Sequence, residues 1–132
     1  MNYFNYMEYR NVLDKSKMDL YDANEAFTKG TIFKTLYKPY KNYLPKEPMS
    51  MTEKGKGMLE IQMYYAASHD LGLYLDVFPN DVNVLRLRNE YLEKYNRALK
   101  AYQDKYGAIE CKESKKVPYS WSTTSWPWEG NK

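Results

Sequence analysis

The residues best suited to chemistry in this chain of 132 residues are His69 and Cys111, each the only one of its kind. A helical His flanked by carboxylates can bind a metal ion, but no Asp or Glu stands three or four residues before His69. A zinc site of the His-Glu-x-x-His type needs a second imidazole. A Ser or Cys triad needs a base other than a single histidine within a helix. The sequence therefore predicts a chain that is not an enzyme and holds no metal or cofactor, with His69 as a packing or hydrogen-bonding residue.

Three weaker signals have simpler interpretations. Gly55 and Gly57 form a Gly-x-Gly with no strand before it, which favours a helix start over a nucleotide-binding loop. The run DVFPNDVN lacks the glycine and the final glutamate of a calcium loop, so its carboxylates are expected to cap a helix. Cys111 lies in the polar run ECKESKK and is expected to be an exposed thiol, with an intermolecular disulfide or a redox role as alternatives.

The C-terminal run VPYSWSTTSWPWEGNK concentrates the three tryptophans, Trp121, Trp126 and Trp128. Pro118 and Pro127 lack the amide donor that a helix interior or a central strand needs, which predicts an extended tail. Indole rings offer large apolar surfaces that are costly to leave in water. Two interpretations stay open: the rings fold back onto the chain's own helices, or they anchor the chain to a partner.

Two long helices are predicted between residues 52 and 107, joined by a turn so short that they must run antiparallel. The first is expected to end near Phe78 and the second near Tyr106. Their boundaries are marked by capping and helix-breaking residues, namely Ser50 or Thr52, Pro79, Asn80 or Asp81, and Gly107.

Apolar residues recur at steps of three and four in both helices, as at the seam of a two-helix contact. The first stripe comprises Ile61, Tyr64, Ser68, Leu71, Leu75 and Phe78. The second comprises Leu85, Leu92, Tyr95, Leu99, Tyr102 and Tyr106, with Arg88 as a charged exception. A further stripe on the opposite side of the first helix contains Leu59, Met63, Ala66, Leu73 and Val77, interrupted by Asp70. In the second helix, Val84, Leu87, Tyr91 and Ala98 also flank the stripe. Because a hairpin cannot bury all these faces, residues 21–45 or further chains must cover the remainder.

The remaining segments are expected to be short or irregular. Residues 1–20 are predicted to be a mobile polar arm, and 46–51 a linker. Residues 21–45 contain signals for two helical turns, with Asp22 and Thr31 as caps and Gly30 ending the first. Residues 108–132 form the Trp-rich tail. The predicted fold class is all-α, a long antiparallel hairpin with short N-terminal helical turns.

Composition disfavours several classes of function. Basic and acidic residues number 20 and 17 and are mixed along the chain, so no basic stripe for nucleic acid is present. No apolar run is long enough to span a bilayer, and the start lacks the pattern of a signal peptide, which predicts an intracellular protein. Tyrosines number 15 against 4 phenylalanines, and tyrosine suits interfaces better than dry cores. Self-association is therefore expected.

Several motifs carry a resemblance to spore coat proteins. The runs HDLGLYLDVFPND, YQDKYG and WSTTSWPWEG resemble the CotJB family, and EAFTKGTIFKTLYKPY resembles the C-terminal part of CotJA, as if the two were fused. The resemblance implies synthesis in the sporulating mother cell and deposition in the endospore coat. It also implies a partner, CotJC, which resembles a manganese catalase.

On this basis we expect a structural subunit that docks the catalase-like protein through aromatic side chains. The candidate residues are Trp121, Trp126, Trp128, Tyr119, Phe33, Tyr37, Tyr40 and Tyr43. The alternative is an accessory subunit that modulates or caps the enzyme's oligomer and active site.

Overall fold

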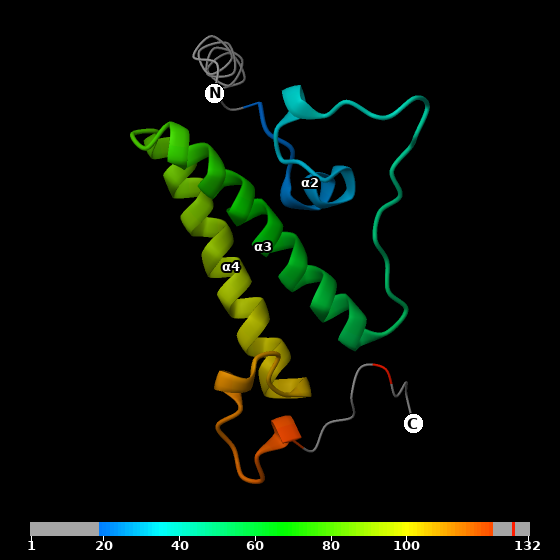
Figure 1. Cartoon of the computed structure of the whole chain (residues 1–132), viewed down its shortest axis with the longest axis vertical. Coiled ribbons are helices and arrows are strands. Elements are labelled where there is room, and N and C mark those ends of the chain that lie inside the picture. Colours follow the sequence, from blue (N-terminus) through cyan, green and yellow to red (C-terminus); the bar gives the residue numbers. More distant parts are fainter. Residues whose placement is uncertain (1–18, 123–127, 129–132) are drawn as a thin grey trace.

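A computed structural model describes residues 19–122 and Trp128, and all its regular elements are helical. The α-helices are α2 (Ala23–Lys29), α3 (Glu53–Val77) and α4 (Val82–Tyr106). Short 3-10 turns are η1 (Lys34–Leu36), η2 (Cys111–Glu113) and η3 (Ser120–Ser122). Helices α3 and α4 pack side by side in opposite directions (Figure 1). The predicted all-α fold with a long antiparallel hairpin is confirmed.

Side-chain caps fix both ends of the turn and the start of the hairpin. The Thr52 hydroxyl oxygen accepts the N–H of Gly55 at 3.0 Å, which starts α3. The Asp81 carboxylate accepts the N–H of Val84 at 3.2 Å, which starts α4. Its other oxygen accepts the hydroxyl of Tyr74 at 2.8 Å, so one carboxylate ties α3 to the start of α4. The interpretation of the acidic turn as capping is confirmed.

The segment before the hairpin, residues 19–37, is called the α2 segment below. Asp22 caps α2 by accepting the N–H of Glu25 at 2.8 Å, and Gly30 ends it with a φ of 83°. The predicted second helical turn is present as the 3-10 turn η1, but it begins at Lys34, whereas a cap at Thr31 would start it at Ile32. Ile32 lies before this turn, where its carbonyl accepts the N–H of Tyr21 at 2.9 Å. Pairing with the chain before α2 satisfies backbone groups that a helix at this position would have satisfied within itself.

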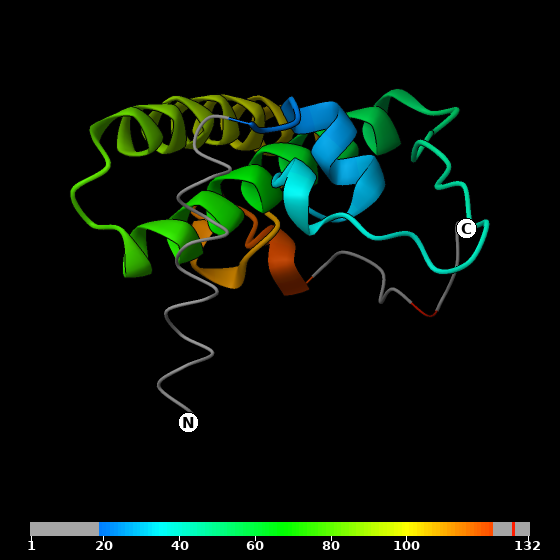
Figure 2. The same cartoon turned by 90° about the horizontal axis from the view of Figure 1, so that it is seen from above.

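The core lies where the α2 segment meets the hairpin, and α3 occupies the middle of the molecule (Figures 1 and 2). Ile32 and Leu71 are fully buried there. The other buried members are Ala23, Ala26, Phe33, Ala67, Tyr74, Val84 and Tyr91. The expectation that another element must pack on the hairpin is confirmed for this face.

The predicted contact stripe of α4 is partly wrong at its start. Val84 and Tyr91 are buried, whereas Leu85 is 42% exposed. The stripe was inferred for a pair of helices, in which Leu85 would face α3. Because the α2 segment also packs against α4, the most deeply buried side of α4 turns toward Val84 and Tyr91. Leu85 therefore lies at the edge of the contact between α3 and α4.

Two further features concern the chain after α4 and the hydropathy of the helices. The 3-10 turns η2 and η3 follow α4 at the end of the hairpin remote from the α3–α4 turn (Figure 1). No helix in the described part of the chain combines the length and hydropathy that a membrane crossing requires.

Candidate docking surfaces

The described part of the C-terminal tail folds against itself through local hydrogen bonds. The Ile109 N–H donates to the side-chain carbonyl of Gln103 at 3.1 Å, which ties the tail to the last turn of α4. Further along, the Trp121 N–H donates to the Ser114 hydroxyl at 3.3 Å. The second of these bonds holds η3 close to the end of η2 despite Pro118 between them.

Within the tail, Tyr119 and Cys111 lie in hydrogen-bonding contact, with the hydroxyl 2.6 Å from Sγ. This contact raises the pKa of the Tyr119 phenol, because the thiol interaction and partial burial both disfavour the phenolate. Cys111 itself is exposed, as predicted. The pair fixes the start of the tail relative to η3.

Three aromatic residues of the tail form what we call the tail surface: Tyr119, Trp121 and Trp128. Their exposed fractions are 47%, 44% and 76%, respectively. None belongs to the core around the α2 segment. Trp126 lies outside the described residues.

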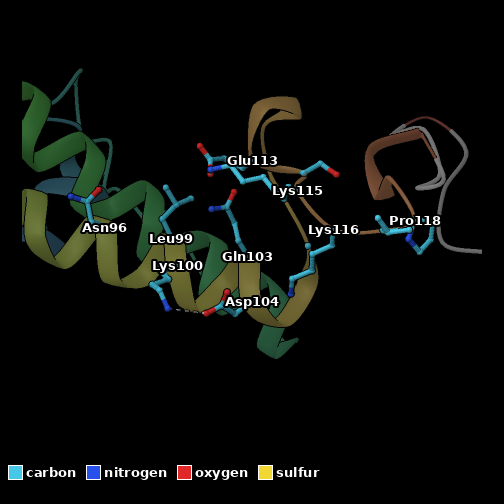
Figure 3. A pocket seen from close by; sticks show the side chains of 13 residues that line it. Asn96, Leu99, Lys100, Gln103, Asp104, Glu113, Lys115, Lys116 and Pro118 are labelled. Atoms are coloured by element: carbon cyan, nitrogen blue, oxygen red, sulfur yellow. Dashed lines mark hydrogen bonds and ion pairs between the residues drawn. The ribbon is translucent and has the colours of Figure 1, made fainter.

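A groove of about 680 Å³ runs between the tail and the C-terminal half of α4 (Figure 3). Leu99, Val117 and Pro118 give it apolar walls, while charged side chains surround them. Lys100 is paired with Asp104 at 3.3 Å along one wall. Its lining thus mixes apolar and charged side chains, as surfaces that contact protein do.

A second aromatic patch, called the tyrosine surface below, follows η1. It contains Tyr37, Tyr40 and Tyr43, and the last two are 77% and 64% exposed. Lys41 has a φ of 51°, in the left-handed region, and the Tyr43 N–H donates to the Tyr40 carbonyl at 3.0 Å. A tight turn therefore follows Pro39. It displays both rings beside a cavity of about 510 Å³.

The predicted docking residues do not lie on one continuous surface. The tyrosine surface follows η1 in the chain beside α2, whereas η2 and η3 follow the end of α4 (Figure 1). Phe33 is only 8% exposed and stacks on Tyr74, with ring centroids 5.9 Å apart, so it belongs to the core. Tyr37 is half-buried and meets Tyr21 edge to face at 6.3 Å.

Of the residues considered for chemistry, His69 and the two glycines of α3 lie apart from both surfaces. His69 is exposed on α3 and stacks on Tyr65, with ring centroids 6.0 Å apart. Across residues 19–122 and 128, no three His, Cys, Asp or Glu side chains are grouped so as to hold a metal ion. Gly55 and Gly57 lie in the first turns of α3, and a Cβ at Gly57 would lie 3.2 Å from the Tyr102 ring. The glycines therefore belong to a helix start and a close helix contact.

Sequence reasoning missed the role of Asp70, which interrupts an apolar stripe of α3. Its carboxylate accepts the backbone N–H of Ile32 at 3.1 Å, across 38 residues of sequence. Burial raises the pKa of Asp70, while the bond from Ile32 opposes the increase. The signal was present in the sequence, because a carboxylate within an apolar stripe marks a place where another polar group must arrive.

Comparison with known proteins gives two family matches. The family model described as CotJB protein matches residues 56–129, which is more than half of the chain. The model described as spore coat associated protein JA (CotJA) matches residues 16–40, ahead of it. Searches of curated proteins and of solved structures returned no match. The matched segments coincide with most of the hairpin and tail, and with the α2 segment that packs on them.

Proposed function

The chain belongs to the CotJB family and carries a CotJA segment ahead of it, and from this premise we propose that it is a structural docking subunit of the endospore coat. The families establish association with the spore coat. The proposal adds that the chain is not itself an enzyme and that it binds a manganese-catalase-like coat protein, the partner that the resemblance to the CotJ proteins implies.

One observation carries the proposal: large aromatic side chains are displayed outside the core on two separate segments, the chain after η1 and the C-terminal tail. Tyr40, Tyr43 and Trp128 are each more than 60% exposed. Tyr and Trp side chains supply most of the energy of protein interfaces, because they bury a large area with few rotatable bonds. The hairpin separates the two surfaces, which suits a subunit that bridges partners in a layered shell.

The α2 segment has a positioning role in this account. It is attached to α3 through the Asp70 bond to Ile32 and the stacking of Phe33 on Tyr74. These contacts fix where the tyrosine surface begins. The CotJA part of the chain therefore acts as a built-in component of the docking subunit.

The test is titration calorimetry, in which purified chain is added to the manganese-catalase-like coat protein and the heat of binding is measured. Replacing Trp121, Trp126 and Trp128 together by Ala is expected to weaken binding by at least about tenfold, while helicity by circular dichroism stays unchanged. The double variant Tyr40→Ala/Tyr43→Ala tests the other surface in the same way. Met49→Ala/Met51→Ala is the matched control, since both side chains are exposed apolar groups in the linker.

The outcomes separate the interpretations. Undiminished binding by both aromatic variants would contradict the proposal. Unfolding of the triple Trp variant would instead indicate that the indoles stabilise the chain's own fold. If binding also changes the turnover of the catalase-like enzyme, the chain is an accessory subunit of that enzyme.

A further inference from the structure

A second groove, called the Arg88 groove below, lies on the side of the hairpin away from the α2 segment. Its volume is about 470 Å³. The lining residues come from both long helices, and they are Tyr65, Ser68, His69, Gly72, Leu73, Leu75, Asp76, Arg88 and Leu92. At 100° per residue, Gly72 and Asp76 of α3 point away from Ala67 and Tyr74, which contact the α2 segment. The groove is thus formed by the opposite face of the same hairpin.

Arg88 is the charged residue that interrupts the apolar stripe of α4, and it is half-buried in this groove. A Cβ at Gly72 would lie 3.4 Å from its Nε, an ordinary contact distance, so the Arg88 side chain lies against α3 at this position. Asp76, one turn beyond Gly72, lines the same groove. Among the described residues, neither Arg88 nor Asp76 forms an ion pair.

Apolar side chains surround these two charges. Tyr65 and Leu73 are each 54% exposed, and Leu85 is 42% exposed one turn before Arg88. Leu85 belongs to the stripe that the sequence assigns to helix contact, yet the α2 segment draws the core of α4 toward Val84 and Tyr91. The stripe containing Leu85, Arg88 and Leu92 therefore runs along the edge of the α3 contact, where Arg88 and Leu92 are half-buried and Leu85 is exposed.

We propose that the Arg88 groove is the interface of a two-fold symmetric dimer, in which a second copy of this chain covers it. A two-fold interface applies one patch to itself, so that each residue i contacts j while j contacts i. The Arg88 groove has the required self-complementarity, with a cation on the α4 wall and an anion on the α3 wall. Arg88 of each copy pairs with Asp76 of the other, and Tyr65, Leu73 and Leu85 are buried around the pairs. The two hairpins then form a four-helix bundle.

A second copy fits this groove better than an unrelated acidic helix. Such a helix would satisfy Arg88 but place another carboxylate near Asp76, and like charges in a closed interface cost binding energy. A copy of the chain pairs both charges at once. The apolar rim excludes water from these pairs, which strengthens them relative to ion pairs on an open surface.

Purified full-length chain tests the proposal by sedimentation equilibrium over a series of concentrations, without any catalase-like partner. Wild-type chain is expected to be a dimer at the highest protein concentrations. Arg88→Glu and Asp76→Arg, each alone, place like charges across the axis and are expected to weaken dimerisation on the order of 100-fold. The double variant Arg88→Glu/Asp76→Arg exchanges the two charges and is expected to restore the dimer. Arg86→Glu is the control, since Arg86 is exposed and does not line the groove.

Circular dichroism of each variant shows that the hairpin is folded before its association is compared. A wild-type chain that stays monomeric at every concentration overturns the proposal. Single variants that dissociate without recovery in the double variant overturn the pairing of Arg88 with Asp76. The docking of a catalase-like protein is measured separately, so failure of either proposal leaves the other standing.

Discussion

Both faces of the α3–α4 hairpin contain charged side chains within an apolar surface, but these charges have different partners. On one face, the α2 segment buries apolar side chains, and the single carboxylate within them, Asp70, accepts the N–H of Ile32 at 3.1 Å. On the other face, Arg88 and Asp76 interrupt the apolar surface and form no ion pair within the described chain. A charged residue within an apolar stripe thus marks a docking position on both faces. On the first face the docked element belongs to the same chain; on the second we infer that it belongs to another copy.

The largest contrast is expected between shortening a buried leucine of α3 and shortening an exposed one. Leu71 is fully buried under the α2 segment, so Leu71→Ala is expected to lower the free energy of unfolding by about 2–5 kcal/mol. Leu73 is 54% exposed, and Leu73→Ala is expected to change it by less than about 0.5 kcal/mol in the monomer. Urea denaturation under dilute conditions measures both. Equal losses would contradict the distinction between a closed face and an open one.

A smaller effect is expected from Asp70. Asp70→Ala leaves the Ile32 N–H without its acceptor and is expected to cost about 1–3 kcal/mol. Asp70→Asn keeps a carbonyl oxygen at the same place and is expected to cost much less. The same denaturation experiment checks both variants, and a stability of Asp70→Ala equal to that of Asp70→Asn would show that the bond does not attach the α2 segment.

The hydrogen bond from Tyr74 to Asp81 is expected to contribute less to the free energy of unfolding than the Asp70 bond does. Tyr74→Phe removes the hydroxyl that donates to Asp81 at 2.8 Å, while the ring continues to stack on Phe33. A loss of about 1 kcal/mol is expected, as for an ordinary hydrogen bond. Thermal unfolding of the variant beside wild type measures it. An unchanged melting temperature would mean that the cap at Asp81 holds the turn without help from Tyr74.

The smallest predicted effect is a dependence on pH. Burial raises the pKa of Asp70 above its ordinary value of 3.8, so the folded state binds this proton more tightly than the unfolded state. Stability from this group therefore increases as the pH falls through the folded pKa toward 3.8, the ordinary value. The free energy of unfolding of wild type, minus that of Asp70→Asn, is expected to rise over this range. A difference that falls with decreasing pH would contradict the assignment.

The sequence predicts the hairpin well because its signals are local. Thr52 and Asp81 cap the helices as their side chains suggest, and Gly30 ends α2 in the left-handed conformation. The contact stripe of α4 was less predictable, because it depends on a third element joining the core. Local spacing contains no information about which side of α4 the α2 segment approaches.

The candidate docking residues illustrate the same limit. Aromatic content indicates surfaces that bind protein, but it does not tell a buried ring from a displayed one. Phe33 and Tyr40 belong to one short aromatic run, yet Phe33 is in the core and Tyr40 is 77% exposed. Phe33 is paired with Leu20 across the α2 segment, a contact that spacing along the chain does not predict, whereas Tyr40 stands at a tight turn around Lys41.

The most direct test of the account is hydroxyl-radical footprinting of purified full-length chain at increasing concentration. Tyr91 lies on the face closed by the α2 segment, where it is 9% exposed, and Tyr65 lies in the Arg88 groove, where it is 54% exposed. The account predicts that Tyr91 is protected from labelling at every concentration, and that Tyr65 becomes protected only as the chain associates. Labelling of Tyr65 that stays high at all concentrations, or ready labelling of Tyr91 in dilute solution, would contradict it.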